Sequence, residues 1–155
     1  MTHRFRSITE SAGPLLVSAC LVGTPCRYDG KSVPCQAIVD LATQRDIVPV
    51  CPEQLGGLPT PRTPSEIQAE GTVVDALGAD RTAAFESGAQ ETLRIARDQG
   101  CTQAILKENS PSCGVHRIYD GTFSGTLVPG QGKTAALLTA AGIAVHSEID
   151  IEGLS

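Results

Sequence analysis

Four short apolar runs recur along the chain, each bounded by residues that favour turns. They span Leu15–Ser18, Ile47–Val50, Gln103–Leu106 and Ile143–His146. Short apolar runs between turn signals predict buried strands, and the longer amphipathic stretches between them predict helices. Strands that alternate with helices predict a mostly parallel sheet joined by right-handed crossovers.

The helices predicted between these strands differ in how clearly their ends are marked. One is expected over about residues 35–44, after a start signal at residues 32–34. The clearest helix begins at a capping Asp80 and ends at Gly100, and the last helix is expected over residues 133–141. The clearest helix carries one apolar stripe, formed by Phe85, Ala89, Leu93 and Ala96.

The remaining segments predict loops and short hairpins. Residues 54–66 contain two glycines and three prolines and form a loop longer than a simple connection. Residues 67–74 favour a short hairpin, and residues 119–123 favour a turn into a small strand or flap. We therefore predict one α/β domain over residues 14–155, with a three-layer, Rossmann-like fold, a mostly parallel sheet and a small hairpin or flap. A flexible extension is expected at residues 1–13.

Charge and composition narrow the possible functions. The net charge is −5, aromatic residues make up 3% of the chain and there is no Trp. This composition disfavours extended nucleic-acid binding, which uses phosphate contacts and base stacking. No apolar run approaches the roughly 20 residues of a membrane span, and no apolar segment follows the basic N-terminal residues as in a secretory signal. We expect a cytoplasmic protein without a membrane partner, as a monomer or weak dimer.

Six cysteines are the main chemical feature of the sequence. Without a secretory signal they argue against a disulfide framework, because the cytosol keeps thiols reduced, and they favour metal binding or catalysis. Cys20, Cys51 and Cys113 each follow a predicted strand directly or closely. If those strands are neighbours, the three thiols meet at one edge of the sheet, where open α/β sheets bind ligands.

Three convergent thiolates suit a soft metal. Zinc sites usually carry Cys-x-x-Cys pairs or several histidines, and neither pattern is present. An iron–sulfur cluster tolerates wide ligand spacing, and three cysteines leave one iron of a 4Fe–4S cluster without a protein ligand. Spacing alone leaves three interpretations open: a cluster, a zinc hydrolase or structural zinc site, and a metal-free protein that binds a small ligand or senses redox state through a thiol.

Two further observations bear on the thiols. Pro111 and Gly114 give the loop around Cys113 a fixed course that neither a strand nor a helix continues. Cys26 lies in the same loop as Cys20 and is the main rival for a ligand position. Cys35 and Cys101 are expected to pack in the core.

Three blocks of sequence resemble the signature of the DUF523 family, which includes thiouracil desulfurases. They are residues 17–23 with 26–30, residues 51–53 (Cys-Pro-Glu) and residues 107–114 (Lys-Glu-Asn-Ser-Pro-Ser-Cys-Gly). The resemblance covers the chain from Leu15 onward. It implies a 4Fe–4S cluster held by Cys20, Cys51 and Cys113, whose remaining iron binds the sulfur of 4-thiouracil. The implied reaction is a non-redox replacement of C=S by C=O that gives uracil and sulfide.

Hydrolysis of a thiocarbonyl needs a base for water, and the sequence offers two candidates for catalysis. Glu53 lies two residues after Cys51 in a turn fixed by proline, where a general-base role is geometrically reasonable. Ser110 lies in the loop of Cys113 and is suited to hydrogen-bond the substrate or relay a proton. The alternatives are a carboxylate that caps a turn and a serine that simply forms one.

Four residues are candidates for holding the substrate ring. Tyr28 is expected to stack on a pyrimidine, and Arg62 or Lys107 to meet a carbonyl or a phosphate. Ser112 is a second hydroxyl in the loop of Cys113. The expected partner is therefore a small thiolated pyrimidine.

Overall fold

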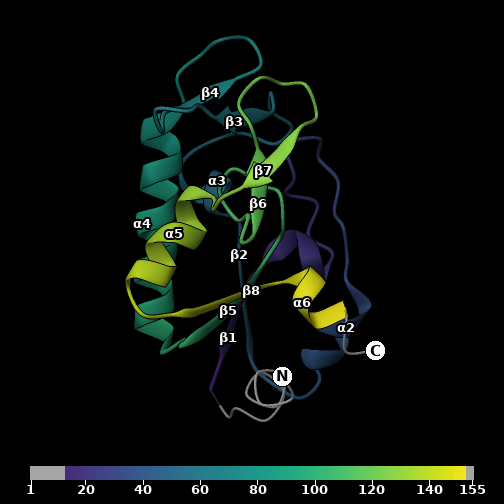
Figure 1. Ribbon diagram of the computed structural model, residues 1–155. Coiled ribbons are helices and arrows are strands. Elements are labelled where there is room, and N and C mark those ends of the chain that lie inside the picture. Colours follow the sequence, from purple (N-terminus) through teal and green to yellow (C-terminus); the bar gives the residue numbers. More distant parts are fainter. Residues whose placement is uncertain (1–12, 153–155) are drawn as a thin grey trace.

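The computed structural model describes residues 13–152, in which four strands form a central sheet (Figure 1). The strand order is β2-β1-β5-β8, and all three neighbouring pairs are parallel. The strands span Leu15–Ser18 (β1), Ile47–Val50 (β2), Gln103–Leu106 (β5) and Ala144–Ser147 (β8). The predicted parallel sheet is confirmed, and only its last strand is shifted, by one residue. The extension predicted at residues 1–13 lies, apart from Gly13, outside the described residues.

Helices cover both faces of the sheet and give the predicted three layers (Figure 1). Two of them, α4 and α5, pack together on one face, and α2 and α6 pack together on the other. They span Gln36–Leu41 (α2), Thr82–Gln99 (α4), Lys133–Ala140 (α5) and Glu148–Glu152 (α6). Within residues 13–152, no helix combines the length and the apolar character needed to cross a membrane.

The core is divided between these two faces because successive side chains of a strand point to opposite sides. Leu15 and Val17 of β1 belong to an apolar cluster with Ile38 of α2. Leu16 belongs to a second cluster with Leu138 of α5. All five side chains are 0% exposed. The two central strands, β1 and β5, are buried along their whole length, which explains why their sequences are mostly apolar.

Several helical segments differ from the prediction. The helix expected over residues 35–44 is shorter, since Cys35 is its N-cap and Leu41 its last residue. Two short helices were not predicted: α3 (Pro52–Leu55), and α6, which follows β8 and makes α5 the penultimate helix. A single helical turn contains too few residues to display a period of 3.6, so the apolar pattern missed both. A 3-10 helix, η1 (Ala19–Val22), directly follows β1.

The long helix α4 keeps the predicted apolar stripe, with one correction at its start. Asp80 precedes the N-cap residue Arg81, and its Oδ1 accepts the Thr82 N–H at 2.8 Å. Gly100 ends the helix with a φ of 75°, a conformation that glycine adopts without strain. Of the predicted stripe, Phe85, Ala89 and Ala96 are buried and Leu93 is half-buried.

Two antiparallel hairpins lie beyond the carboxyl ends of the sheet strands (Figure 1). β3 (Ser65–Ile67) pairs with β4 (Val73–Asp75), and β6 (Arg117–Tyr119) pairs with β7 (Leu127–Pro129). β3 and β6 are in contact, so the two hairpins pack against each other. The predicted hairpin and flap are confirmed. Together they cover the carboxyl-terminal edge of the central sheet, where the loops after the strands begin.

A pair of glycines brings α3 into close contact with α4. A Cβ on Gly88 would lie 2.0 Å from the carbonyl oxygen of Pro52, and a Cβ on Gly56 would lie 2.0 Å from that of Ala84. Since neither glycine has a positive φ, the close approach itself is what requires glycine. The contact fixes the turn that directly follows Cys51.

Gly88→Ala is therefore expected to lower the free energy of unfolding by about 1–3 kcal/mol, the usual cost of overpacking. Alanine is favoured over glycine inside a helix by about 1 kcal/mol, so helix propensity alone predicts the opposite sign. Urea unfolding measures the difference, with Ser87→Ala on the exposed face of α4 as the matched control. A more stable Gly88→Ala variant would contradict the close contact.

Candidate active site

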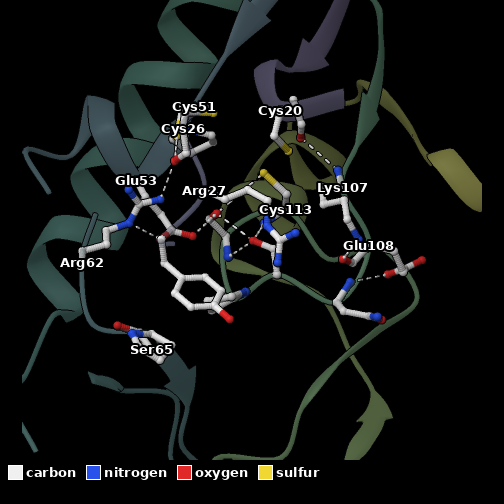
Figure 2. A pocket seen from close by; sticks show the side chains of 18 of the residues that line it. Cys20, Cys26, Arg27, Cys51, Glu53, Arg62, Ser65, Lys107, Glu108 and Cys113 are labelled. Atoms are coloured by element: carbon white, nitrogen blue, oxygen red, sulfur yellow. Dashed lines mark hydrogen bonds and ion pairs between the residues drawn. The ribbon is translucent and has the colours of Figure 1, made fainter. Parts of the chain in front are cut away.

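The carboxyl ends of three adjacent strands bring three predicted thiols together. Cys20 lies in η1 after β1, Cys51 directly follows β2, and Cys113 lies in the loop after β5. Because β1 lies between β2 and β5, all three face one cavity of about 460 Å³. The predicted convergence is confirmed. Figure 2 shows the sulfur atoms at one end of the cavity, with Glu53 and Arg62 to one side and Lys107 and Glu108 to the other.

Cys26 adds a fourth thiol to this cavity. Its side chain hydrogen-bonds with those of Cys20 and Cys51, and the bond with Cys20 together with burial raises its pKa. The bond with Cys26 and burial likewise raise the pKa of Cys51. These thiols are not in disulfide bonds. Within residues 13–152, no three His, Cys, Asp or Glu side chains are arranged to hold a single metal ion.

The other two cysteines lie outside the cavity, as predicted. Cys35 is buried in the apolar cluster on the α2 side of the sheet, and Cys101 is buried in the cluster on the α4 side. Burial raises the pKa of Cys101. Both side chains pack as small apolar groups.

Cys113 is buried among hydroxyl groups. Removal from water raises its pKa to about 12, against the opposing effect of the nearby Ser18 and Ser112 hydroxyls. The Ser112 hydroxyl lies 3.6 Å from the sulfur. The loop is held by Ser110, whose Oγ accepts the N–H groups of Ser112 at 3.1 Å and Cys113 at 3.0 Å. Ser110 therefore forms the turn that was its alternative role, and it also lines the cavity, so its predicted catalytic role stays a prediction.

A chain of hydrogen bonds joins this loop to Glu53 of α3. The Ser112 hydroxyl donates to Glu53 Oε2 at 3.1 Å, and the Ser110 and Ser112 hydroxyls are 3.0 Å apart. A hydroxyl carries one hydrogen, and the Ser112 oxygen is closer to Glu53 Oε2 than to the Cys113 sulfur, so Ser112 donates to Glu53 while Ser110 donates to Ser112. The two serines and the carboxylate therefore form a path along which a proton can move.

Arg62 donates four hydrogen bonds to acceptors of the protein. Its Nε donates to Glu53 Oε1 at 2.9 Å and its Nη2 to the carbonyl oxygen of Cys26 at 2.9 Å. Its Nη1 donates to the carbonyl oxygen of Pro59 at 3.1 Å and to Thr60 Oγ1 at 2.8 Å. Arg62 lines the cavity and positions the Glu53 carboxylate and the Cys26 loop. Its expected contact with a substrate carbonyl or phosphate stays a prediction, to which one remaining Nη2 hydrogen is available.

Arg62→Lys is expected to destabilise the fold by about 3 kcal/mol, because one ammonium cannot reach the acceptors that the guanidinium joins, and the half-buried Glu53 carboxylate loses its partner. The matched control is Arg27→Lys. Within residues 13–152 the Arg27 side chain makes no ion pair, and its Cζ lies 5.7 Å from the centre of the Tyr28 ring. Urea unfolding of both variants measures the difference, and equal stabilities would contradict the positioning role of Arg62.

Lys107 and Tyr28 both line the cavity, as predicted, with different surroundings. The Lys107 ammonium pairs with Glu148 Oε2 at 3.0 Å and donates to the carbonyl oxygen of Glu108 at 3.0 Å. The positive charge of Lys107 is thus largely neutralised by groups of the protein itself. Tyr28 is 40% exposed, with the Arg27 guanidinium over one face of its ring.

Glu108 is a structural residue of the site that the sequence analysis did not single out. Its Oε1 accepts the N–H groups of residues 115, 116 and 117 at 2.7, 2.8 and 3.1 Å. Burial raises its pKa, but these backbone donors outweigh burial and lower it overall. The carboxylate therefore closes the loop that carries Ser110 and Cys113. The one available sequence signal was an acidic residue at the last position before the Asn-Ser-Pro-Ser-Cys turn.

A comparison with known protein families shows which family this chain belongs to. A family model described as 2-thiouracil desulfurase matches residues 15–150. The chain belongs to the 2-thiouracil desulfurase family. The matched range includes every thiol and carboxylate described above, and it confirms the DUF523 resemblance. The thiouracil desulfurases are enzymes, so the cavity is the candidate active site of one.

The chain is also similar to individual proteins over most of its length. The chain is 43% identical over 149 residues to the uncharacterized protein YbbK of Bacillus subtilis (strain 168), covering 90% of this chain and 99% of that protein. A solved structure described as the 4Fe–4S-dependent thiouracil desulfidase TudS superposes with a TM-score of 0.83 at 46% identity. That comparison covers 92% of this chain and 95% of TudS.

Proposed function

We propose that the protein removes sulfur from a thiouracil without net oxidation or reduction, at a 4Fe–4S cluster held by Cys20, Cys51 and Cys113. The observation that carries the proposal is the meeting of these thiols, at the ends of three adjacent parallel strands, with the Glu53–Ser112–Ser110 chain in one cavity. Membership of the desulfurase family and the likeness to a 4Fe–4S-dependent relative support it.

The donor set fits such a cluster. Thiolates are the ligands that iron–sulfur clusters take, and the cavity presents free thiols on separate strand ends, backed by serine hydroxyls. Hydrogen bonds to ligating sulfur tune a cluster, which gives Ser18 a role beside Cys113. We assign Cys26 to supporting Cys20 and Cys51 instead of replacing one of them.

The overall reaction balances as thiouracil plus water giving uracil plus hydrogen sulfide. An iron without a protein ligand supplies a Lewis acid for the thiocarbonyl sulfur. The residues of this chain then handle water and protons. Glu53 is the proposed general base, held by Arg62 on one oxygen and by Ser112 on the other. Ser110 and Ser112 pass a proton between the carboxylate and the reacting ring.

We propose 4-thiouracil, free or as part of a small pyrimidine compound, as the substrate. The description of the family names 2-thiouracil instead, so the position of the sulfur is part of the test. The cavity has both polar and apolar walls, from serine, tyrosine and phenylalanine side chains, as a flat heteroaromatic ring requires.

The test is to reconstitute the protein anaerobically, measure iron and acid-labile sulfide, and assay 2-thiouracil and 4-thiouracil in parallel. We expect four irons and four sulfides per chain and turnover of 4-thiouracil. Stoichiometric zinc without inorganic sulfide would contradict the cluster. Turnover of 2-thiouracil alone would contradict only the position of the sulfur.

A further inference from the structure

Phe123, in the turn of the β6–β7 hairpin, is held in an unusual backbone conformation. Its φ is 56°, although it is neither glycine nor asparagine. Its side chain is 39% exposed and lines the active-site cavity. Bulky residues rarely adopt positive φ, and such strain persists where the surrounding structure enforces it, often at ligand-binding positions.

The enforcing contacts come from the neighbouring β3–β4 hairpin. Oε1 of Glu66 in β3 accepts the N–H groups of Gly121 at 2.9 Å and Phe123 at 3.2 Å. Gln68 Nε2 donates to the carbonyl oxygen of Gly121 at 3.0 Å. The hairpin is also pressed onto β3, since a Cβ on Gly121 would lie 2.7 Å from the carbonyl oxygen of Ile67. Glu66 is 9% exposed, so this clamp is largely shielded from water.

Two other aromatic residues line the cavity: Tyr119 is half-buried, and Tyr28 is exposed but its ring is partly occupied. The Arg27 guanidinium covers one face of it. No such cation–aromatic contact is found for Phe123 among the described residues. Phe123 is therefore the better aromatic surface for a ligand.

We propose that Phe123 stacks on the pyrimidine ring and selects flat heteroaromatic thiocarbonyl compounds, and that Glu66 is the residue that positions it. This inference rests on the proposed function and adds a specificity-determining contact to it. The stacked ring holds the thiocarbonyl in the cavity that the thiols and Glu53 share. Stacking acts on binding and leaves the proton-transfer groups untouched.

The decisive variant is Phe123→Asn. Asparagine tolerates a positive φ, so the substitution removes the ring without straining the turn. We expect KM for 4-thiouracil and the inhibition constant of uracil to rise roughly tenfold, within the range measured for base–aromatic stacking. The iron content, Tm and kcat should stay near those of the wild type. Leu77→Asn, at a side chain 84% exposed and outside the cavity, is the matched control.

The role of Glu66 is tested by a double-mutant cycle. Glu66→Ala should raise KM as Phe123→Asn does, and the double variant should be no worse than Phe123→Asn alone, because both changes remove one contact. Glu66→Gln keeps an acceptor oxygen and should recover much of the loss. The inference would be overturned if KM were unchanged in Phe123→Asn. It would also be overturned if the rise in KM of the double variant equalled the product of the rises in Glu66→Ala and Phe123→Asn. Absence of wild-type turnover would instead contradict the proposed function itself.

Discussion

Cys113→Ala is expected to abolish both the cluster and desulfuration. The residue supplies one of the three proposed iron ligands from the loop after β5 and is 4% exposed, with no other cysteine on that loop to replace it. We expect the loss of bound iron to exceed the roughly 100-fold that removal of a supporting contact costs. Bound iron is measured by iron and sulfide analysis and by visible absorption after anaerobic reconstitution. Cys20→Ala and Cys51→Ala should lose the cluster in the same way as Cys113→Ala.

Two other buried cysteines provide matched controls for this substitution. Cys26→Ala removes the fourth thiol of the cavity, and Cys101→Ala removes a thiol from the core; their side chains are 2% and 5% exposed. Both variants should keep a full cluster, although Cys26→Ala loses the hydrogen bonds to Cys20 and Cys51. The proposed ligand set would be refuted if Cys26→Ala lost the cluster while Cys20→Ala, Cys51→Ala or Cys113→Ala kept it. That result would show that Cys26 is a ligand.

Glu53→Gln is expected to reduce kcat by about 100-fold to 10,000-fold, the range that general acid–base catalysis contributes. Glutamine keeps an oxygen for the Ser112 hydroxyl but cannot take a proton from water. The iron content should remain that of the wild type, which separates this effect from loss of the cluster. Steady-state kinetics at saturating 4-thiouracil measures kcat.

The control for this variant is Glu86→Gln, which changes an exposed carboxylate of α4 in the same way. It should leave kcat unchanged. If Glu53→Gln kept most of the wild-type kcat with an intact cluster, the base would lie elsewhere. Ser110 would then be the next residue to replace.

The strands of the sheet could be predicted from the sequence because each strand is marked by a few consecutive residues. β1, β2 and β5 are short, mostly apolar segments, so the pattern of apolar and polar residues was enough to predict their bounds. Convergence of Cys20, Cys51 and Cys113 then required only that the three strands be neighbours. That is a topological condition, which the usual rules for parallel α/β folds favour.

The details of the site that the sequence did not predict depend on contacts between distant segments. Cys26 is held by Arg62, 36 residues away, and Ser112 meets Glu53 across 59 residues. The clamp of Glu66 on Phe123 spans 57 residues. Contacts between distant residues leave no periodic pattern in the sequence, so the surroundings of Arg62 and the role of Phe123 could be seen only in the structure. Short helices such as α3 were not predicted for a different reason, because a single turn is too short to show a helical period.

The most direct test of the central claim is to count products. The anaerobically reconstituted protein is incubated with 4-thiouracil and no added reductant, and uracil and sulfide are both quantified. The account predicts one uracil and one sulfide for each thiouracil consumed, and none with Cys113→Ala. A protein with an intact cluster that releases no sulfide, or does so only with an electron donor, would contradict it.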